Sequence, residues 1–198
     1  NILIKNMVGR EIDNIYPSRV SKKSGEVVLE VKNWSAYDPA LGRNVLKDIS
    51  FNVKKGEIVG FAGLMGSGRT ELALSIFGNP NGYRINGEMF INNERKQFNH
   101  PYDAIRLGLA YVTEDRKGNG LILIQDVKQN ITLANLQEIA DRGVVDNNAE
   151  VKVANEYRES LNIKTPSIEQ RVSNLSGGNQ QKVSLGKWLF VKPNVLIL

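Results

Sequence analysis

The stretch EIVGFAGLMGSGRTELALSIF, residues 57–77, decides the fold. Its first seven residues are mostly apolar and predict a buried strand, whereas ELALSIF at 71–77 predicts a helix that ends before Gly78. The glycine-rich loop GLMGSGRT lies between them, at residues 63–70. A strand, a glycine loop and a helix in this order are typical of α/β domains in which backbone amides at the helix N-terminus converge on phosphate groups.

The loop fits the pattern GxxxxGK[ST] except that Arg69 replaces the lysine. Glycine at 63 and 68 permits backbone angles and a close approach that a side chain would block. The hydroxyl of Thr70 is a candidate magnesium ligand. Because a planar guanidinium does not reproduce a compact ammonium between two phosphates, we expect binding without efficient chemistry. The candidate nucleotide-binding residues of the loop are Gly63, Leu64, Met65, Gly66, Ser67, Gly68, Arg69 and Thr70. A glycine turn with no ligand is the alternative.

Working outward, the hydrophobic pattern predicts a mixed α/β domain with a helical insert. Residues 1–26 have little periodic apolar surface and read as a linker. The insert, at about 118–173, carries a capping-box spacing at Asn147 and Glu150. The predicted strands lie at 27–34, 46–53, 57–63, 88–93, 109–114 and 195–198, and a helix begins at Pro101.

Composition excludes several classes of protein. The chain has 198 residues, of which 41% are hydrophobic and 24% charged, and no apolar run approaches the length of a membrane-spanning helix. The absence of cysteine and the single histidine, His100, exclude disulfides, zinc–thiolate sites and triad hydrolases. The net charge of +5 is scattered along the chain, so we expect no nucleic-acid partner. Both ends read as interrupted, and we expect a piece of a longer polypeptide.

A second glycine turn, LSGGNQQK, begins at Leu175 and enters another predicted helix. Backbone amides and a serine at a positive helix end can face a phosphate. A capped helix without a ligand is the alternative. The residues of this turn are Leu175, Ser176, Gly177, Gly178, Asn179, Gln180 and Gln181.

This turn resembles the LSGGQ signature of the ATP-binding cassette (ABC) proteins, with Asn179 in the place of the glutamine. Together with GLMGSGRTEL and EDRKGNGLIL, it is similar to the second cassette of the tandem ATPase subunits of bacterial ribose, galactose and xylose importers. NMVGRE, at residues 6–11, resembles the junction after the first cassette. The resemblance implies the P-loop NTPase fold of ABC ATPases, with a core sheet and a helical subdomain over 27–198, C-terminally truncated.

The resemblance also implies roles for two further residues. Tyr37 stands where an aromatic ring stacks on adenine; Trp34 is the rival, and packing of either ring within the first strands is the alternative. Glu114 occupies the Q-loop position, where the family usually has a glutamine near magnesium and the attacking water. A locally paired, solvated turn is the alternative for the run Glu114, Asp115 and Arg116.

In the family, two cassettes sandwich ATP and Mg²⁺ between the glycine loop of one and the signature of the other. The implied partners are a preceding cassette, a transmembrane permease and, indirectly, a sugar-binding protein, at the cytoplasmic face of the membrane. The family's aspartate and glutamate after VLIL lie beyond Leu198. We therefore expect no catalytic residue in this chain, no hydrolysis by the chain alone, and exposed apolar surface.

Two other functions compete with this interpretation. A cassette ATPase of nucleic-acid repair would account for the positive charge, but the dispersed aromatic residues argue against it. A P-loop kinase or GTPase would account for the first glycine loop but leaves LSGGNQQK without a role.

Overall fold

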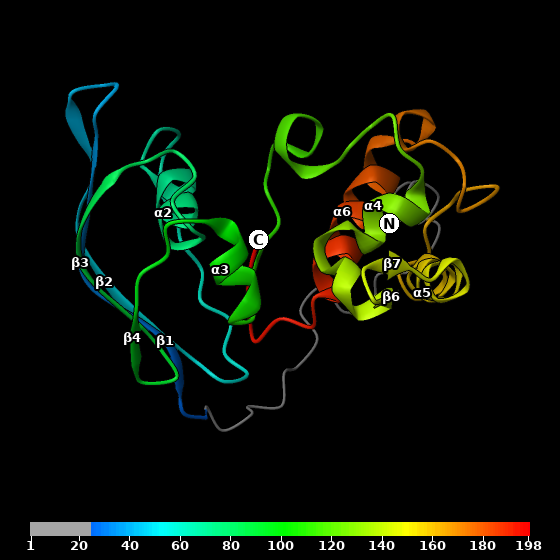
Figure 1. Cartoon of the computed structure of the whole chain (residues 1–198). Coiled ribbons are helices and arrows are strands. Elements are labelled where there is room, and N and C mark those ends of the chain that lie inside the picture. The colour runs from blue at the N-terminus through cyan, green and yellow to red at the C-terminus, as the bar shows by residue number, and fades with distance from the viewer. Residues whose placement is uncertain (1–24) are drawn as a thin grey trace, which may run out of the picture.

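A computed structural model describes residues 25–198; the predicted linker at 1–26 and the NMVGRE segment lie wholly or almost wholly outside the described residues. The chain forms two lobes (Figure 1). The first contains the sheet β2-β1-β3-β4 and helices α2 and α3, and the second contains helices α4, α5 and α6. No helix among residues 25–198 combines the length and apolar character needed to cross a bilayer.

The first lobe is built on a four-stranded antiparallel sheet. Its strands are β1 (Val27–Asp38), β2 (Arg43–Lys54), β3 (Arg84–Ile91) and β4 (Glu94–Lys96). β1 is central and pairs with β2 on one side and β3 on the other. Apolar residues alternate along β1, so that Leu29, Val31, Trp34 and Ala36 are buried. Register shifts between Val31 and Trp34 keep the inward face apolar on both sides of the irregularity.

Behind this sheet lie two helices and a short parallel pair of strands. They are α2 (Arg69–Ile76), α3 (Pro101–Arg106), β5 (Leu109–Tyr111) and β8 (Val195–Ile197). Pro101 begins α3, as the sequence predicts. His100 caps this helix, because its Nδ1 accepts a hydrogen bond from the Tyr102 amide at 3.1 Å. The histidine therefore has a structural role.

The second lobe is mainly helical. Its elements are η1 (Arg116–Gly120), α4 (Val127–Thr132), η2 (Leu133–Ile139), β6 (Ala140–Asp141), β7 (Val144–Val145), α5 (Asn147–Ser160), η3 (Val172–Asn174) and α6 (Gly177–Phe190). Its own apolar core includes Val127, Ile131, Val172 and Val183. Trp188 of α6 belongs instead to the core of the first lobe, where its ring meets Phe77 edge-on at 5.4 Å between centroids. Helix α6 therefore joins the two cores.

The predicted capping box at Asn147 and Glu150 is wrong. The N-cap of α5 is Asp146, whose carboxylate accepts hydrogen bonds from the amides of Asn148 and Ala149. Glu150 is buried instead, where it accepts a hydrogen bond from Thr132 Oγ1 at 2.9 Å and lies 3.4 Å from Lys128 Nζ. Glu150 does not cap the helix because a buried carboxylate needs a hydrogen-bond or ion-pair partner, and Thr132 and Lys128 supply these partners.

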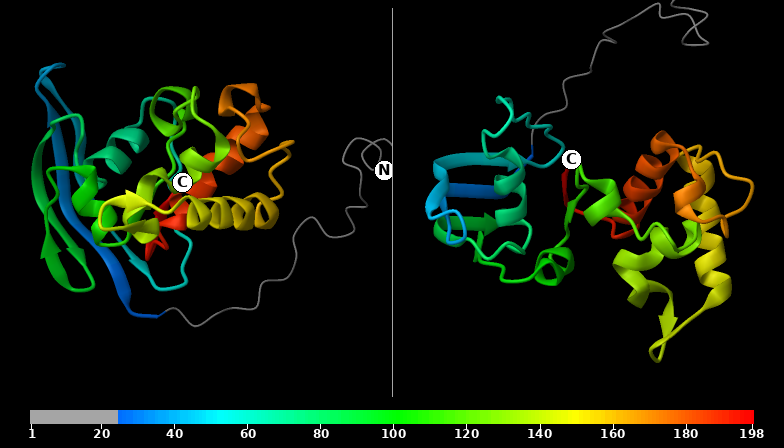
Figure 2. Two further views of the ribbon diagram at one scale, coloured as in Figure 1. Left: turned by 45° about the vertical axis from the view of Figure 1, so that its right-hand side comes forward. Right: turned by 90° about the horizontal axis from the view of Figure 1, so that it is seen from above.

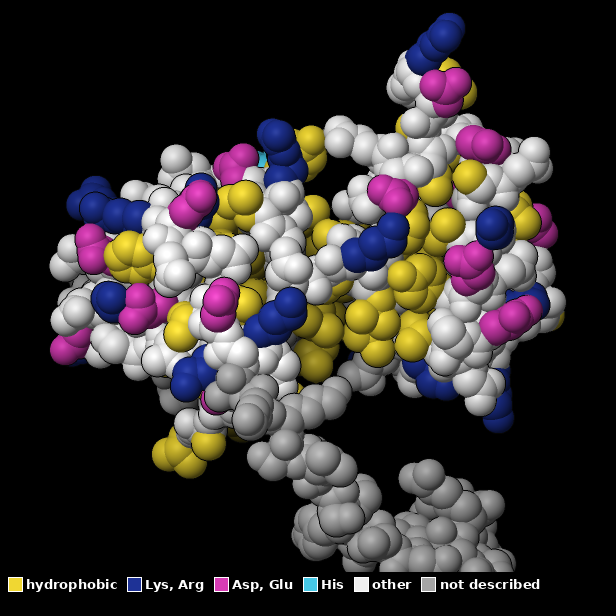
Figure 3. All heavy atoms as spheres, turned by 90° about the horizontal axis from the view of Figure 1, so that it is seen from below, with side chains coloured by type: hydrophobic (Ala, Val, Ile, Leu, Met, Phe, Trp, Pro, Cys, Tyr) yellow, Lys and Arg dark blue, Asp and Glu magenta, His cyan; other side chains and the backbone are white. Residues whose placement is uncertain are grey.

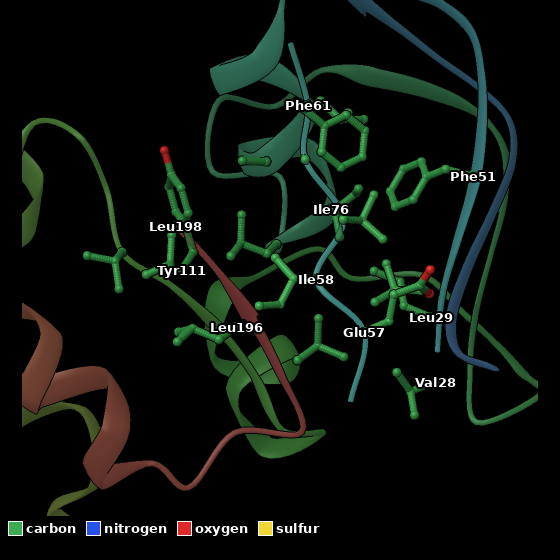
Figure 4. Close-up of a pocket in the computed structure, with 18 of the residues that line it drawn as sticks. Val28, Leu29, Phe51, Glu57, Ile58, Phe61, Ile76, Tyr111, Leu196 and Leu198 are labelled. Carbon is green, nitrogen blue, oxygen red and sulfur yellow. The ribbon is translucent and has the colours of Figure 1, made fainter. Parts of the chain in front are cut away.

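The strand predicted at 57–63 is also not formed. β8 pairs with β5 on one side, and an apolar cavity of about 670 Å³ lies between β8 and residues 57–61 (Figure 4). Without a neighbouring strand, this extended segment has no ladder of hydrogen bonds. Its apolar side chains are correspondingly exposed, Ile58 by 84% and Phe61 by 45%, which confirms the expectation of exposed apolar surface. Apolar side chains also gather between the lobes on the face seen from below (Figure 3).

Candidate functional site

The glycine loop before α2 needs its glycines for geometric reasons. Gly66 and Gly68 have φ angles of 78° and 90°, in the left-handed region that other residues rarely adopt. A Cβ at Gly68 would also lie 2.9 Å from Leu46 Cδ2 and 3.0 Å from the Val45 carbonyl oxygen. Any side chain at position 68 would therefore both strain the backbone and push β2 away.

The backbone amides of this loop are largely unpaired. The Ser67 amide donates to the Leu64 carbonyl at 3.1 Å, but no protein acceptor within residues 25–198 meets the amides of Gly66, Gly68 or Arg69. Gly66 and Arg69 are exposed, as is Met65 beside them, whereas Gly68 is buried against β2. The amides also lie at the positive end of α2, a position that favours a negatively charged group.

Two residues singled out in the sequence meet beside this loop. Thr70 Oγ1 at the start of α2 donates a hydrogen bond to Glu114 Oε1 at 2.5 Å, although the two residues are 44 positions apart. Glu114 follows the strand β5 in the chain. A hydroxyl and a carboxylate are oxygen ligands of the kind that Mg²⁺ takes, so the pair fits this metal.

Arg69, the residue in the lysine place, is exposed. Among the described residues it makes neither an ion pair nor a side-chain hydrogen bond. Its guanidinium is thus free to approach a phosphate at the mouth of the loop, as a flexible charge outside the turn.

The structure separates the two aromatic candidates. Trp34 is only 3% exposed, and its Nε1 donates to Ser75 Oγ of α2 at 2.9 Å. It packs beneath α2 and is not available to a ligand. Tyr37, farther along β1, is half-buried, and the guanidinium of Arg84 lies 5.9 Å from its ring centroid. Of the two rings, Tyr37 alone keeps surface on which a flat base could stack.

The second glycine turn is braced by its own side chains. Ser176 is the N-cap of α6 but makes no side-chain cap to the helix; its Oγ accepts instead from Asn179 Nδ2 at 3.0 Å. Asn179 Oδ1 accepts in turn from the Lys164 amide at 2.9 Å. Asn179, the departure from LSGGQ, therefore links the serine of the turn to the segment that follows α5.

Gln180 and Gln181 differ sharply in their surroundings. Gln180 is only 5% exposed, and its Nε2 donates to the Val172 carbonyl at 3.0 Å, on the chain just before the turn. Gln181 is exposed and faces solvent. Gly178 is exposed, and nothing lies within 4 Å of a Cβ added to it, so the first turn of α6 is open on that side.

The two glycine turns belong to different lobes, as the views of Figure 2 and the labels of Figure 1 show. No hydrogen bond within residues 25–198 joins them directly. An indirect connection runs through the segment that contains η1. Glu114, which accepts the hydrogen bond from Thr70, lies two residues before Arg116, whose Nε donates to Gln180 Oε1 at 3.4 Å. At the end of η1, the Gly120 carbonyl accepts a hydrogen bond from Lys187 Nζ of α6. Burial lowers the pKa of Lys187 to about 8. Sequence reasoning missed Arg116 and Lys187, because no spacing marks a contact 64 or 67 residues apart.

The fold and the loop define a nucleotide-binding α/β domain of the P-loop class. The profile of the ABC transporter family matches residues 46–198, and the chain belongs to this family. The resemblance stated from the two glycine motifs is confirmed at this level.

Several sugar-transport proteins are similar to the chain over nearly its whole length. The L-arabinose transport ATP-binding protein AraG of Geobacillus stearothermophilus is 52% identical over 99% of the chain, which covers 38% of AraG. The xylose import ATP-binding protein XylG of Thermoanaerobacter pseudethanolicus is 50% identical over 100% of the chain and 39% of XylG. The chain thus spans well under half the length of these curated relatives.

Solved structures agree on the fold. A nucleotide-free ATP-binding cassette from an ABC transporter superposes with a TM-score of 0.67 at 17% identity, covering 86% of this chain and 68% of that one. A second cassette, solved as a dimer in a post-hydrolysis state with ADP and Pi, also gives 0.67, at 24% identity over 85% and 72% of the two chains. The predicted fold class, an ABC ATPase P-loop fold, is confirmed.

Proposed function

We propose that this chain is the ATP-binding domain of a bacterial monosaccharide ABC importer, as the second cassette of a tandem ATPase subunit. The observation that carries the proposal is the glycine loop at 63–70, whose free amides open beside the Thr70–Glu114 pair. The names of AraG and XylG support a sugar as the cargo. Their length, more than twice that of the chain, leaves room for a preceding cassette.

In this function, the loop holds the phosphates of ATP through the amides of Gly66, Gly68 and Arg69. Tyr37 stacks on the adenine, and Arg84 supports the ring from β3. Thr70 and Glu114 would hold Mg²⁺, which when bound neutralises charge on the phosphates. Glu114 brings a negative charge where the family's usual glutamine brings none, and this charge would repel the phosphates unless Mg²⁺ lay between them.

The signature turn acts on a different nucleotide. Ser176 and the amides of Gly177 and Gly178 face the terminal phosphate of ATP held in the loop of the preceding cassette. We assign hydrolysis to that composite site, and regulation or slow turnover to the site that contains Arg69. No residue of this chain is assigned the role of polarising water.

Binding of ATP between the cassettes draws the two halves of the ATPase together. The surface near Glu114 and the helical lobe pass this closure to the transmembrane permease at the cytoplasmic face of the membrane. An external sugar-binding protein delivers the cargo to the permease. No nucleic acid takes part.

The assignment of the two sites can be tested in the full-length polypeptide assembled with its permease. Ser176→Arg blocks the signature turn with a bulky cation and should lower ATP hydrolysis by about 100-fold. Arg69→Ala should keep most of the hydrolysis, because it affects the slow site. Ser173→Arg, on the exposed turn η3 just before the signature, is the matched control and should behave as wild type. If Arg69→Ala abolishes hydrolysis and Ser176→Arg does not, the assignment is reversed.

A further inference from the structure

The carboxylate of Glu114 has a hydrogen-bond donor but no counter-charge. Thr70 Oγ1 donates to its Oε1 at 2.5 Å. Within residues 25–198, Glu114 forms no ion pair, and neither does Arg69, the residue before Thr70. Glu114 is also exposed. A negative charge beside the glycine loop is therefore left without a cation to match it.

This charge lies beside the group of amides that favours an anion. The Arg69 amide has no protein acceptor within the described residues, and the next residue, Thr70, holds the carboxylate of Glu114. A phosphate bound by the loop amides would therefore lie close to that carboxylate. At a separation of a few ångströms, repulsion between two negative charges weakens binding by a factor of about 10 or more.

A divalent cation would remove this conflict, but the pair alone cannot hold one firmly. Neighbouring ligands of an octahedral Mg²⁺ ion lie about 3 Å apart, so the two oxygens of Thr70 and Glu114 need to separate only slightly. Nowhere in residues 25–198 do three or more histidine, cysteine, aspartate or glutamate side chains gather in a way that could hold a metal. Water and phosphate oxygens must therefore supply the other ligands.

We propose that Glu114 makes the glycine loop selective for a nucleotide–cation complex over the free nucleotide. Without the cation the carboxylate repels the phosphates, and without the nucleotide the Thr70–Glu114 pair holds a cation weakly. Each ligand thereby raises the affinity for the other, and by the same factor. A glutamine at this position would carry no charge and would discriminate far less. This inference deepens the proposed function and rests on it.

The test follows hydrogen exchange of the loop at 63–70 in the full-length polypeptide while ATP is added, in the presence of either Mg²⁺ or EDTA. The ATP concentration that half-protects the loop measures the affinity at this loop alone. Glu114→Gln removes the charge and keeps the shape. The matched control is Asp115→Asn, which removes the neighbouring charge from a carboxylate whose Oδ1 accepts from the Gly118 amide at 3.0 Å.

In the wild type, half-protection in EDTA should need about 100-fold more ATP than with Mg²⁺. Glu114→Gln should bind ATP in EDTA about 10-fold more tightly than the wild type, because the repulsion is gone. With Mg²⁺ its affinity should change by less than about threefold, because the amide oxygen still serves as a ligand. Asp115→Asn should keep the wild-type ratio within about twofold. A gain of affinity for metal-free ATP is a result that a damaged fold does not produce.

Two results would overturn the inference alone. One is equal affinity of the wild type for ATP with Mg²⁺ and in EDTA; the other is a Glu114→Gln variant that gains no more affinity in EDTA than Asp115→Asn does. The wild-type comparison needs no variant, so it decides the matter even if Glu114→Gln does not fold. If ATP protects the wild-type loop under neither condition, the proposed function fails together with the inference.

Discussion

Two glycine turns begin helices in this chain, and the protein holds them in different ways. The turn before α2 uses left-handed glycines and leaves amides without protein acceptors, while its helix is anchored from beneath by Trp34. The turn before α6 has its side chains linked to one another and to neighbouring segments through Asn179 and Gln180. We propose that the first is a receptor that a ligand completes, and that the second is a preformed surface presented to a ligand held elsewhere.

The largest effect is expected beneath the first turn. Trp34→Ala removes a buried ring and its bond to Ser75 of α2, and should lower the free energy of unfolding by about 3–5 kcal/mol. Tyr37→Ala, on the same strand, should cost less than about 1 kcal/mol but weaken ATP binding by about 1–3 kcal/mol, the scale of base stacking. Urea denaturation and ATP titration of both variants measure this. Equal losses of stability would remove the distinction between an anchor and a ligand contact.

The two turns should also differ in how strictly they need glycine. Gly68→Val forces a β-branched residue into a left-handed conformation against β2, and should destabilise the protein by about 3 kcal/mol while abolishing nucleotide binding at this loop. Gly178→Ala is the matched control. Nothing lies within 4 Å of its added Cβ, and alanine suits a helix, so the stability should change by less than about 1 kcal/mol, in the favourable direction. A large loss in Gly178→Ala would show that the second turn is as constrained as the first.

The pH dependence of stability tests how helix α6 is buried beyond the second glycine turn, at Lys187. Its folded-state pKa of about 8 lies below the 10.5 of a free lysine, because burial disfavours the charged form. Between these two values the unfolded chain binds more protons than the folded chain, so the stability contributed by this group rises with pH. From pH 7.5 to 9.5, the wild type should gain about 2 kcal/mol relative to Lys187→Met.

Denaturation of the wild type and Lys187→Met across this pH range measures the gain, with exposed Lys117→Met as the control that should run parallel to wild type. A constant difference between wild type and Lys187→Met would mean that the ammonium stays fully charged, held by the Gly120 carbonyl.

The smallest effect is expected at the brace of the second turn. Asn179→Ala removes the hydrogen bonds to Ser176 and to the Lys164 amide, and should lower the free energy of unfolding by about 1–2 kcal/mol. Gln181→Ala, its exposed neighbour, should change it by less than about 0.5 kcal/mol. If the two variants are equally stable, the turn is not preformed by its side chains.

Much of the site could be predicted from the sequence because its signals are local. The glycine pattern at 63–70, the serine before Gly177 and the proline at the start of α3 each determine the backbone within one turn, and the structure begins helices α2, α3 and α6 there. The contacts that connect these turns could not be predicted. Thr70 and Glu114 are 44 positions apart and Arg116 and Gln180 are 64 positions apart, and each pair meets only through the tertiary fold.

The errors have the same origin. Residues 57–63 have the composition of a buried strand, but a strand exists only where a neighbour supplies hydrogen bonds, and an apolar cavity takes that place. Asn147 and Glu150 have the spacing of a capping box, yet Glu150 is buried and pairs with Thr132 and Lys128 instead. Local patterns thus predict what a segment can form, and the tertiary partners decide what it does form.

The central claim is that the amides of the loop at 63–70 are open to an anion, and hydrogen exchange of the full-length polypeptide tests it most directly. We expect fast exchange at Gly66, Gly68 and Arg69 without ligand, strong protection on addition of Mg²⁺ and ATP, and no protection in Gly68→Val. Slow exchange at these amides before nucleotide is added, or exchange that Mg²⁺ and ATP leave unchanged, would contradict the account.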